Sequence, residues 1–350
     1  MGLRLTGLRQ WVEQVFAELK IDLAADWQCV PVSGDASFRR YFRVKSDGQS
    51  WILMDAPPEK EDSHPFVCIA NAWETLEIHA PRVYAVDFDQ GYMLLSDLGD
   101  DLYLGQLNDD SADELYRQAL QTLIHIQPCQ EITDYPLAYY DRALLQREMD
   151  LFRDWLVADL LAIEVGPGVK HLFAEVSDYL IESALAQPQV CVHRDYHSRN
   201  LLVDGEGTPG VIDFQDAVIG PITYDLVSLL RDCYIEWPDK RVYGWVDQFA
   251  EMLLAEGTLT EYDRETFYRW FDLMGAQRHL KAAGIFARLY LRDGKAGYLE
   301  DIPRTVNYII RVAGRYDALF TFSTWLQEVV VPAMYASEQF DPQHLDKWFS

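Results

Sequence analysis

Two short apolar runs constrain the fold of this chain more than any other feature. They cover residues 201–203 and 211–212, and the linker between them, D-G-E-G-T-P-G, is rich in turn-forming residues. Such a linker lets the two runs pair as an antiparallel hairpin. The hairpin would bring Asn200, directly before the first run, beside Asp213, directly after the second. An amide oxygen and a carboxylate at one place are hard ligands that suit Mg²⁺.

The residues before this hairpin add a third functional group. Residues 193–200 read H-R-D-Y-H-S-R-N, which fits the H-R-D-x-x-x-x-N pattern of kinase catalytic loops. In that template Asn200 and Asp213 hold the Mg²⁺ that bridges the β- and γ-phosphates of ATP, and Asp195 accepts or orients the proton of the attacking hydroxyl. A chance tripeptide is the alternative, but the three residues stand at the correct offsets in a strand, turn, strand context. The pattern therefore favours phosphoryl transfer.

Two residues are expected to position this segment rather than to react. His193 is interpreted as a residue that organises the loop, because Asp195 already fills the place of the base. Asp225 follows in Y-D-L and could brace the loop from a helix. An ordinary acid at a helix N-terminus is the alternative for Asp225.

The chain before about residue 98 reads mostly as strands, and the chain after it mostly as helices. The predicted strands cover 28–32, 41–45, 51–54, 83–88 and 92–95, and the predicted helices of this part cover 8–19 and about 63–78. This order predicts an α+β fold with the two lobes of a protein kinase. Residues 1–98 would form a β-rich nucleotide-binding lobe, and residues 99–350 a mainly helical lobe for catalysis and substrate binding.

Several residues of the first part are candidates for binding the nucleotide. The string S-G-D-A-S lies between two predicted strands, where a phosphate-covering hairpin should be, although a plain β-turn is the alternative. The connection at 94–98 is where adenine should lie. The residues assigned to the nucleotide are Ser33, Gly34, Asp35, Ser37, Arg43 and Asp97.

The lysine that kinases carry on their third strand is missing, because that strand reads W-I-L-M-D-A-P. Arg43 or Lys45 on the neighbouring strand, or Lys60 downstream, could supply the phosphate cation, or each could be a solvated surface charge. Glu74 or Glu77 on the following helix could be its partner. Which cation replaces the lysine stays open at this stage.

A cationic stripe is unexpected in so acidic a chain. Four basic residues fall within an arc of roughly 80° at helical spacing: Arg278, Lys281, Arg288 and Arg292. The stripe could recognise an anionic or richly hydroxylated substrate, or it could pair with nearby acids. We assign Arg278 to a substrate contact, together with three polar residues around the catalytic segment: His197, Arg199 and Asp216. Asp216 could instead be a surface turn residue.

Composition excludes several classes of partner. A formal charge of −26 repels nucleic-acid phosphates and anionic lipids. The start of the chain lacks a continuous apolar signal region, and no stretch of 18 apolar residues follows. Five scattered cysteines without a C-x-x-C pair indicate reduced thiols. We therefore expect a cytoplasmic monomer that binds neither nucleic acid nor membrane and acts on a small molecule.

With these residues in hand, the whole chain resembles the aminoglycoside phosphotransferase family, a small-molecule branch of the protein-kinase-like fold. Within it, the chain is similar to the bacterial kinases that phosphorylate the anomeric hydroxyl of N-acetylmuramate and N-acetylglucosamine in peptidoglycan recycling. Besides the catalytic segment, the resemblance rests on G-D-A-S-F-R-R-Y-F from residue 34, L-M-D-A-P-P-E from residue 53 and Q-R-H-L-K-A-A-G-I-F from residue 277. It implies ATP and Mg²⁺ as cofactors and an amino sugar as substrate, with Asp195 as the base.

Three other functions compete with this one. A protein kinase would need a long peptide-docking segment after Asp213, whereas Gly220-Pro221 leads almost at once to Asp225 and no A-P-E element follows. Kinases of choline, aminoglycosides or homoserine remain open, because an acidic chain could favour cationic substrates. A catalytically inactive nucleotide-binding protein is the third alternative, against which the intact catalytic segment argues.

Overall fold

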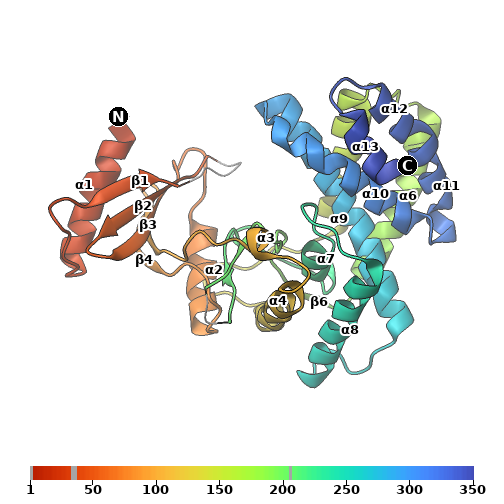
Figure 1. The fold of residues 1–350 in the computed structure, drawn as a ribbon. Coiled ribbons are helices and arrows are strands. Elements are labelled where there is room, and N and C mark those ends of the chain that lie inside the picture. Colours follow the sequence, from red (N-terminus) through yellow and green to blue (C-terminus); the bar gives the residue numbers. More distant parts are fainter. Residues whose placement is uncertain (1–2, 33–37, 205–206) are drawn as a thin grey trace. The chain divides into compact units, whose positions relative to one another are not determined.

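The computed structural model describes residues 3–32, 38–204 and 207–350, and its fold is α+β (Figure 1). The chain gathers into two compact units. The first, called the sheet unit here, consists of Met1–Gln106, Glu131–Leu137 and Arg199–Asp216. The second, called the helical unit, consists of Leu107–Gln130, Ala138–Ser198 and Ala217–Ser350.

The sheet unit is built on a five-stranded antiparallel sheet, which confirms the strands predicted before residue 98. Its strands run in the order β1-β2-β3-β5-β4. Their bounds are Gln28–Pro31 for β1, Arg40–Ser46 for β2, Gln49–Asp55 for β3, Val83–Asp87 for β4 and Tyr92–Ser96 for β5. The helices of this unit are α1 (Leu3–Glu18), α2 (His64–Thr75) and the short α3 (Tyr103–Gln106).

One hydrophobic core joins α1 to this sheet. Leu8, Val12 and Phe16 recur at helical spacing on α1 and are buried. They pack with side chains of the strands, among them Val44 and Trp51, and the rings of Phe16 and Trp51 meet edge to face with centroids 4.9 Å apart. Burial of this stripe fixes the first helix on the sheet.

The predicted hairpin forms, and it belongs to the sheet unit. Strand β7 (Leu201–Leu202) pairs antiparallel with β8 (Gly210–Val211). The N–H of Val211 donates to the carbonyl of His79 over 2.8 Å. Directly after the hairpin, the ring of Phe214 packs against Phe66 and Trp73 of α2, with centroids 4.7 and 5.0 Å away. These contacts attach a segment from the middle of the sequence to α2 and the residues that follow it.

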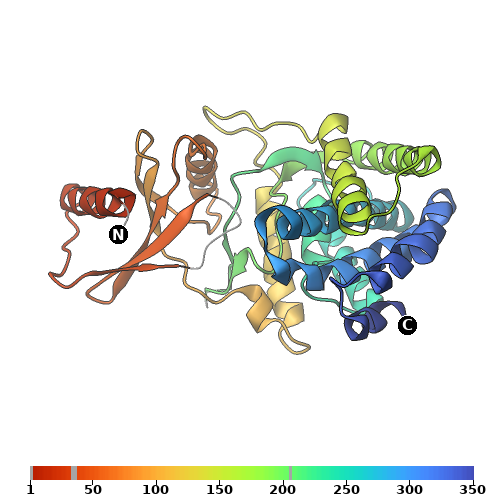
Figure 2. The ribbon, with the colours of Figure 1, turned by 90° about the horizontal axis from the view of Figure 1, so that it is seen from above.

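The helical unit is arranged around one long helix, α9 (Arg264–Asp293), which lies among the other helices in Figures 1 and 2. Strands β6 (Gln189–Val192) and β9 (Val218–Pro221) pair antiparallel within this unit. The helices preceding α9 are α4 (Ala112–Ile126), α5 (Arg142–Leu151), the π-helix η1 (Phe152–Leu160), α6 (Pro167–Leu185), α7 (Tyr224–Leu230) and α8 (Asp239–Ala255). Those following it are η2 (Ala296–Asp301), α10 (Ile302–Ala313), η3 (Asp317–Leu319), α11 (Phe320–Trp325), η4 (Leu326–Val330), α12 (Val331–Ala336) and α13 (Pro342–Phe349).

Helix α9 approaches a neighbouring backbone closely at Gly284. A Cβ added at Gly284 would lie 2.6 Å from the carbonyl oxygen of Leu151 and 2.5 Å from the backbone nitrogen of Phe152. Those atoms mark the junction between α5 and η1. Only glycine permits this backbone contact, so Gly284 sets the distance between α9 and its neighbour.

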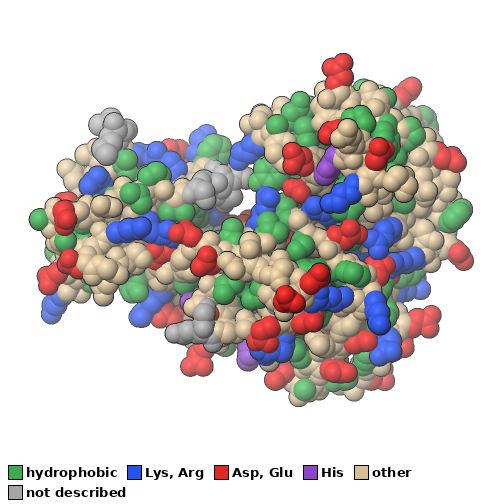
Figure 3. All heavy atoms as spheres, viewed as in Figure 1, with side chains coloured by type: hydrophobic (Ala, Val, Ile, Leu, Met, Phe, Trp, Pro, Cys, Tyr) green, Lys and Arg blue, Asp and Glu red, His purple; other side chains and the backbone are tan. Residues whose placement is uncertain are grey.

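Charged side chains of both signs are dispersed over the face seen in Figure 3. Basic side chains lie between the acidic ones. Among the described residues, no helix combines the length and apolar character that crossing a membrane requires.

Candidate active site

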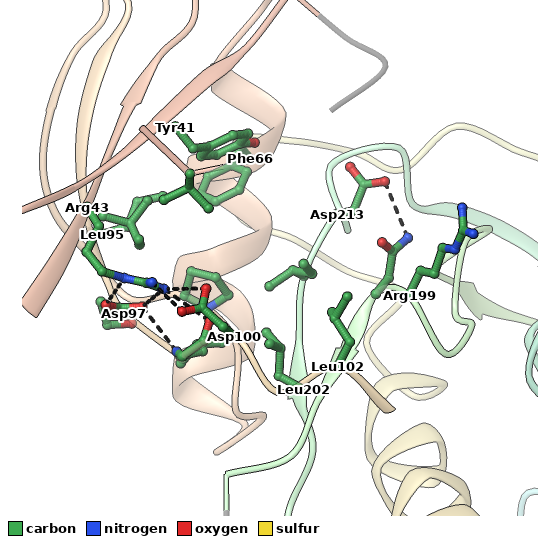
Figure 4. Close-up of a pocket in the computed structure, with 18 residues that line it drawn as sticks. Tyr41, Arg43, Phe66, Leu95, Asp97, Asp100, Leu102, Arg199, Leu202 and Asp213 are labelled. Atoms are coloured by element: carbon green, nitrogen blue, oxygen red, sulfur yellow. Dashed lines mark hydrogen bonds and ion pairs between the residues drawn. The ribbon is translucent and has the colours of Figure 1, made fainter. Parts of the chain in front are cut away.

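A pocket of about 320 Å³ lies within the sheet unit, which is within the size range of small-molecule sites (Figure 4). Arg43, Asp97 and Asp100 stand at one end of it, and Asp213 stands at the other (Figure 4). Between these ends the lining is mainly apolar. The apolar lining residues are Val32, Tyr41, Ile52, Phe66, Pro81, Leu95, Leu98, Leu102, Leu202 and Ile212. The middle of the pocket can therefore hold a flat apolar part of a ligand, and a charged part of the same ligand would lie near Asp213.

An ion-pair cluster of one arginine and two aspartates occupies one end of the pocket. Arg43 donates from Nε and Nη2 to the two oxygens of Asp97, over 2.6 and 2.9 Å. It also donates to Asp100 over 2.9 Å and to the carbonyl of Gly99 over 3.2 Å. Hydrogen bonds to Asp100 and Asp97 raise the pKa of Arg43 above its ordinary value. Arg43 and Asp97 both line the pocket, and their assignment to the nucleotide stays a prediction.

The hairpin brings the two predicted magnesium ligands together. Nδ2 of Asn200 donates to Oδ2 of Asp213 over 3.4 Å, and Gln215 donates to Oδ1 over 2.8 Å. Asp213 has a φ of 65°, a left-handed conformation that a non-glycine residue adopts only when its surroundings hold it there. The predicted adjacency of Asn200 and Asp213 is therefore confirmed.

The segment that begins at His193, the predicted catalytic loop, follows β6 in the helical unit and is braced by α7. The carboxylate of Asp225 accepts the backbone N–H of His193 over 2.6 Å and that of Arg194 over 3.0 Å. Arg194 has a φ of 77°, so these two hydrogen bonds hold a strained turn. Burial raises the pKa of Asp225 to about 6. The bracing role predicted for Asp225 is confirmed.

His193 organises the same loop. Its side chain is fully buried, and its Nδ1 accepts the backbone N–H of Asp195 over 3.2 Å. The ring therefore fixes the backbone of the candidate base and does not itself face solvent.

The surroundings of Asp195 keep its carboxyl ionised. Burial by itself raises the pKa of this group, but the positive charges of Lys281, Arg278 and Arg194 act against burial and lower the pKa below its usual value. At neutral pH the side chain is thus a carboxylate, the state in which it can accept a proton.

A buried ion-pair network holds two of those cations. Nη2 of Arg194 lies 2.5 Å from Glu148, and Nζ of Lys281 lies 3.3 Å from the same carboxylate oxygen. Lys281 also donates to the hydroxyl of Tyr224 over 3.1 Å. Sequence reasoning missed Glu148, because it is a single acid in a long helical segment and no local motif marks it.

The basic residues of the cationic stripe have different surroundings. Lys281 pairs with Glu148, and Arg292 pairs on the surface with Asp293 over 2.8 Å, so ion pairing accounts for both. Arg278 differs, because its side chain is only 5% exposed and its Nη1 lies 3.5 Å from the thiol of Cys233. Its Nε has no hydrogen-bond partner among the described residues.

The remaining predicted substrate residues lie in different places. His197 is in the helical unit, where its ring meets that of Tyr234 with centroids 5.4 Å apart, and burial lowers its pKa to about 4. Arg199 lines the pocket of the sheet unit beside Asn200. Asp216 is exposed at the end of the sheet unit.

Four residues assigned to the nucleotide belong to one short segment of the chain. Ser33, Gly34, Asp35 and Ser37 lie outside the described residues. Their assignment to the phosphates stays a prediction.

Comparison with known proteins identifies relatives over most of the chain. The family model described as "Phosphotransferase enzyme family" matches residues 28–271. The N-acetylmuramate/N-acetylglucosamine kinase of Pseudomonas putida is 43% identical over 332 residues, which cover 93% of this chain and 96% of that protein. The enzyme of the same name from Neisseria meningitidis is 40% identical, with coverage of 92% and 95%.

Solved structures share the fold at low sequence identity. The ethanolamine kinase of Plasmodium vivax matches with a TM-score of 0.61 at 13% identity, covering 91% of this chain and 89% of that one. The GDP complex of aminoglycoside 2'-phosphotransferase-IIIa matches with a TM-score of 0.58 at 12% identity, covering 88% and 99%. These matches confirm the predicted protein-kinase-like fold.

Proposed function

The chain belongs to the phosphotransferase enzyme family, and we propose on this premise that it transfers the γ-phosphoryl group of ATP to the anomeric hydroxyl of N-acetylmuramate, N-acetylglucosamine or both. The observation that carries the proposal is an intact catalytic segment in a chain whose relatives, at 40–43% identity, are named kinases of these two sugars. The reaction would serve peptidoglycan recycling, as the resemblance in sequence implies.

ATP occupies the pocket of the sheet unit in this proposal. In this arrangement adenine lies in the apolar part of the pocket near residues 94–98, and the phosphates extend toward Asn200 and Asp213. The volume of about 320 Å³ suits a bound nucleotide whose phosphate tail extends outward.

Asn200 and Asp213 would hold Mg²⁺. The two side chains offer an amide oxygen and carboxylate oxygens, which this ion prefers, and it commonly fills its other positions with phosphate oxygens and water. When bound, the ion neutralises charge on the β- and γ-phosphates. Gln215 orients the Asp213 carboxylate by donating to Oδ1 over 2.8 Å.

Asp195 is the proposed catalytic base. Its carboxylate accepts the proton of the sugar 1-OH while the oxygen attacks the γ-phosphorus, and the bond from phosphorus to the leaving ADP oxygen breaks. Because the C1–O bond of the sugar stays intact, the product keeps the configuration of the bound anomer.

Arg278 is the proposed substrate contact. Its buried guanidinium influences the charge of Asp195, and its Nε lacks a hydrogen-bond partner among the described residues. A carboxylate such as the lactyl group of N-acetylmuramate would satisfy it in a bidentate manner. His197, Arg199 and Asp216 are kept as further candidates for the sugar site.

We also propose the division of labour expected from the sequence. Residues 1–98 form the nucleotide-binding lobe, residues 99–350 form the catalytic and substrate-binding lobe, and the enzyme acts as a monomer. The 199–216 segment, which gathers with the sheet unit, contributes the magnesium ligands to the nucleotide end.

The test is turnover with a panel of acceptors. Purified protein is incubated with Mg·ATP and, separately, N-acetylmuramate, N-acetylglucosamine, glucosamine, kanamycin, choline and homoserine, and ADP release is followed. We expect C1 phosphorylation of the N-acetyl sugars, reduced about 10²- to 10⁴-fold in Asp195→Asn. Turnover with an amine substrate alone would refute the sugar assignment. Nucleotide binding without turnover of any acceptor would favour a catalytically inactive protein.

A further inference from the structure

In the proposed function the nucleotide phosphates need a cation, and the third strand carries no lysine to supply it. The candidates named from the sequence are poorly placed for this task. Arg43 is held by Asp97 and Asp100, at the end of the pocket opposite Asp213 (Figure 4). Lys45 is exposed and lies beside Ser50 across the strand pair. Lys60 is exposed and rests over the ring of Phe38, 5.4 Å from its centroid.

Arg39, directly before β2, is placed differently from these three. Its side chain is only 10% exposed. Nη2 lies 3.2 Å from Oε2 of Glu61, and Nη1 lies 3.8 Å from Oδ1 of Asp213. A guanidinium is therefore held beside one of the two proposed magnesium ligands, at the phosphate end of the pocket.

The two carboxylate oxygens of Glu61 both help to hold Arg39 in position. Oε1 of this carboxylate accepts the backbone N–H of Phe38 over 3.0 Å, while Oε2 pairs with Arg39. Kinases pair their phosphate-binding lysine with a helix glutamate in a similar way. The glutamates expected from the sequence do not serve here, because Glu74 pairs with Arg82 over 3.0 Å and Glu77 is exposed.

The neighbouring arginine shows that this placement is specific. Arg40 follows Arg39 directly, and its guanidinium pairs with Asp55, a fully buried carboxylate that also binds Arg4 over 2.6 Å. The two arginines thus serve different carboxylates, one inside the sheet unit and one at the pocket end. Arg40 pairs with a carboxylate that is not among the pocket-lining residues, whereas Arg39 pairs with Glu61 and lies beside Asp213, which lines the pocket.

We propose that Arg39, held by Glu61, is the cation that binds the nucleotide phosphates beside Asp213, in a chain that lacks the strand lysine of other kinases. The inference rests on the proposed function, since it assumes that the pocket binds ATP. A guanidinium beside Asp213 can donate two parallel hydrogen bonds to phosphate oxygens, which an ammonium cannot. Arg39 would therefore orient the phosphate chain as well as neutralise it.

The test is nucleotide affinity, measured by calorimetry for ATP, ADP and adenosine, in EDTA and again with Mg²⁺. In Arg39→Ala we expect ATP and ADP to bind about 10- to 100-fold more weakly under both conditions, the range for a lost charge-assisted hydrogen bond. Adenosine affinity should not change, which also shows that the variant is folded. Arg39→Lys should recover part of the loss. Lys60→Ala, which removes a neighbouring charge, is the matched control and should bind all three ligands as the wild type does.

Four outcomes would overturn the inference. Equal loss of adenosine and ATP affinity would make Arg39 a structural support of the pocket. A loss seen only with Mg²⁺ would mean that Arg39 acts through Asp213 and not on the phosphates. Unchanged ATP affinity in Arg39→Ala, with normal binding by the wild type, would refute the inference and leave the proposed function standing. A wild-type protein that binds no nucleotide would refute both.

Discussion

Two glycines of α9 should respond in opposite ways to the same substitution. Gly275 and Gly284 are both buried inside this helix. A Cβ at Gly275 would meet Nη1 of Arg231 at 3.5 Å, an ordinary van der Waals contact. A Cβ at Gly284 would overlap the backbone of Leu151 and Phe152.

The magnitudes follow from helix propensity and from overpacking. Replacing glycine by alanine inside a helix stabilises it by about 1 kcal/mol, and both variants receive this gain. At Gly284 the methyl group would stand 2.5 Å from the nitrogen of Phe152, so the facing backbone must retreat by roughly 1 Å, at a cost of about 3 kcal/mol. We therefore expect Gly275→Ala to gain about 1 kcal/mol and Gly284→Ala to lose about 2 kcal/mol.

Equilibrium urea denaturation of the two variants and the wild type measures this difference, with the slope m checked for constancy. Because α9 also carries Arg278 and Lys281, Gly284→Ala should lower kcat/KM for the sugar more than its effect on ATP affinity suggests. If Gly284→Ala were as stable as Gly275→Ala, the close approach of α9 to the α5–η1 junction would be wrong. Equal destabilisation of both variants would instead show that Gly275 is confined too.

Three further predictions concern single groups. Asp225→Ala removes the acceptor of the His193 and Arg194 N–H groups, so stability should fall by about 2 kcal/mol and kcat at least tenfold; unchanged kcat would contradict the bracing role. Arg278→Ala should raise KM about tenfold for N-acetylmuramate and little for N-acetylglucosamine, and an equal effect on both sugars would exclude the carboxylate contact. Burial lowers the pKa of His279 from 6.5 to about 3, so the unfolded chain binds a proton in this range that the folded chain does not. The free energy of unfolding should therefore fall as pH drops below about 6.5, by at most about 1.4 kcal/mol per pH unit. In His279→Gln this contribution to the pH dependence should be absent. Denaturation series at several pH values measure the difference.

The sequence determined the features that depend on neighbours along the chain. Alternating apolar residues predicted the strands of the N-terminal sheet, and a turn-rich linker predicted the hairpin that joins Asn200 to Asp213. The same local pattern predicted Asp195 as the base. In each of these cases the residues concerned lie within one short segment of the chain or follow one period, so little besides local geometry is needed.

Only the tertiary structure decided which charges meet. Three arginines of one short stretch are chemically alike but have different partners. Arg39 pairs with Glu61 and Asp213. Arg40 pairs with Asp55, and Arg43 pairs with Asp97 and Asp100. Likewise, Lys281 of the cationic stripe is paired with Glu148, whereas Arg278 lies against Cys233.

The physical reason is that any guanidinium can pair with any carboxylate. The choice among them depends on which side chains long-range packing brings within a few ångströms, because screened charges interact strongly only at close range. Such proximity is set by contacts between residues far apart in the chain, as when Glu148 meets Lys281 or Asp225 meets His193. The sequence therefore determined the type of chemistry, and the packed structure decided which residues can position its charges.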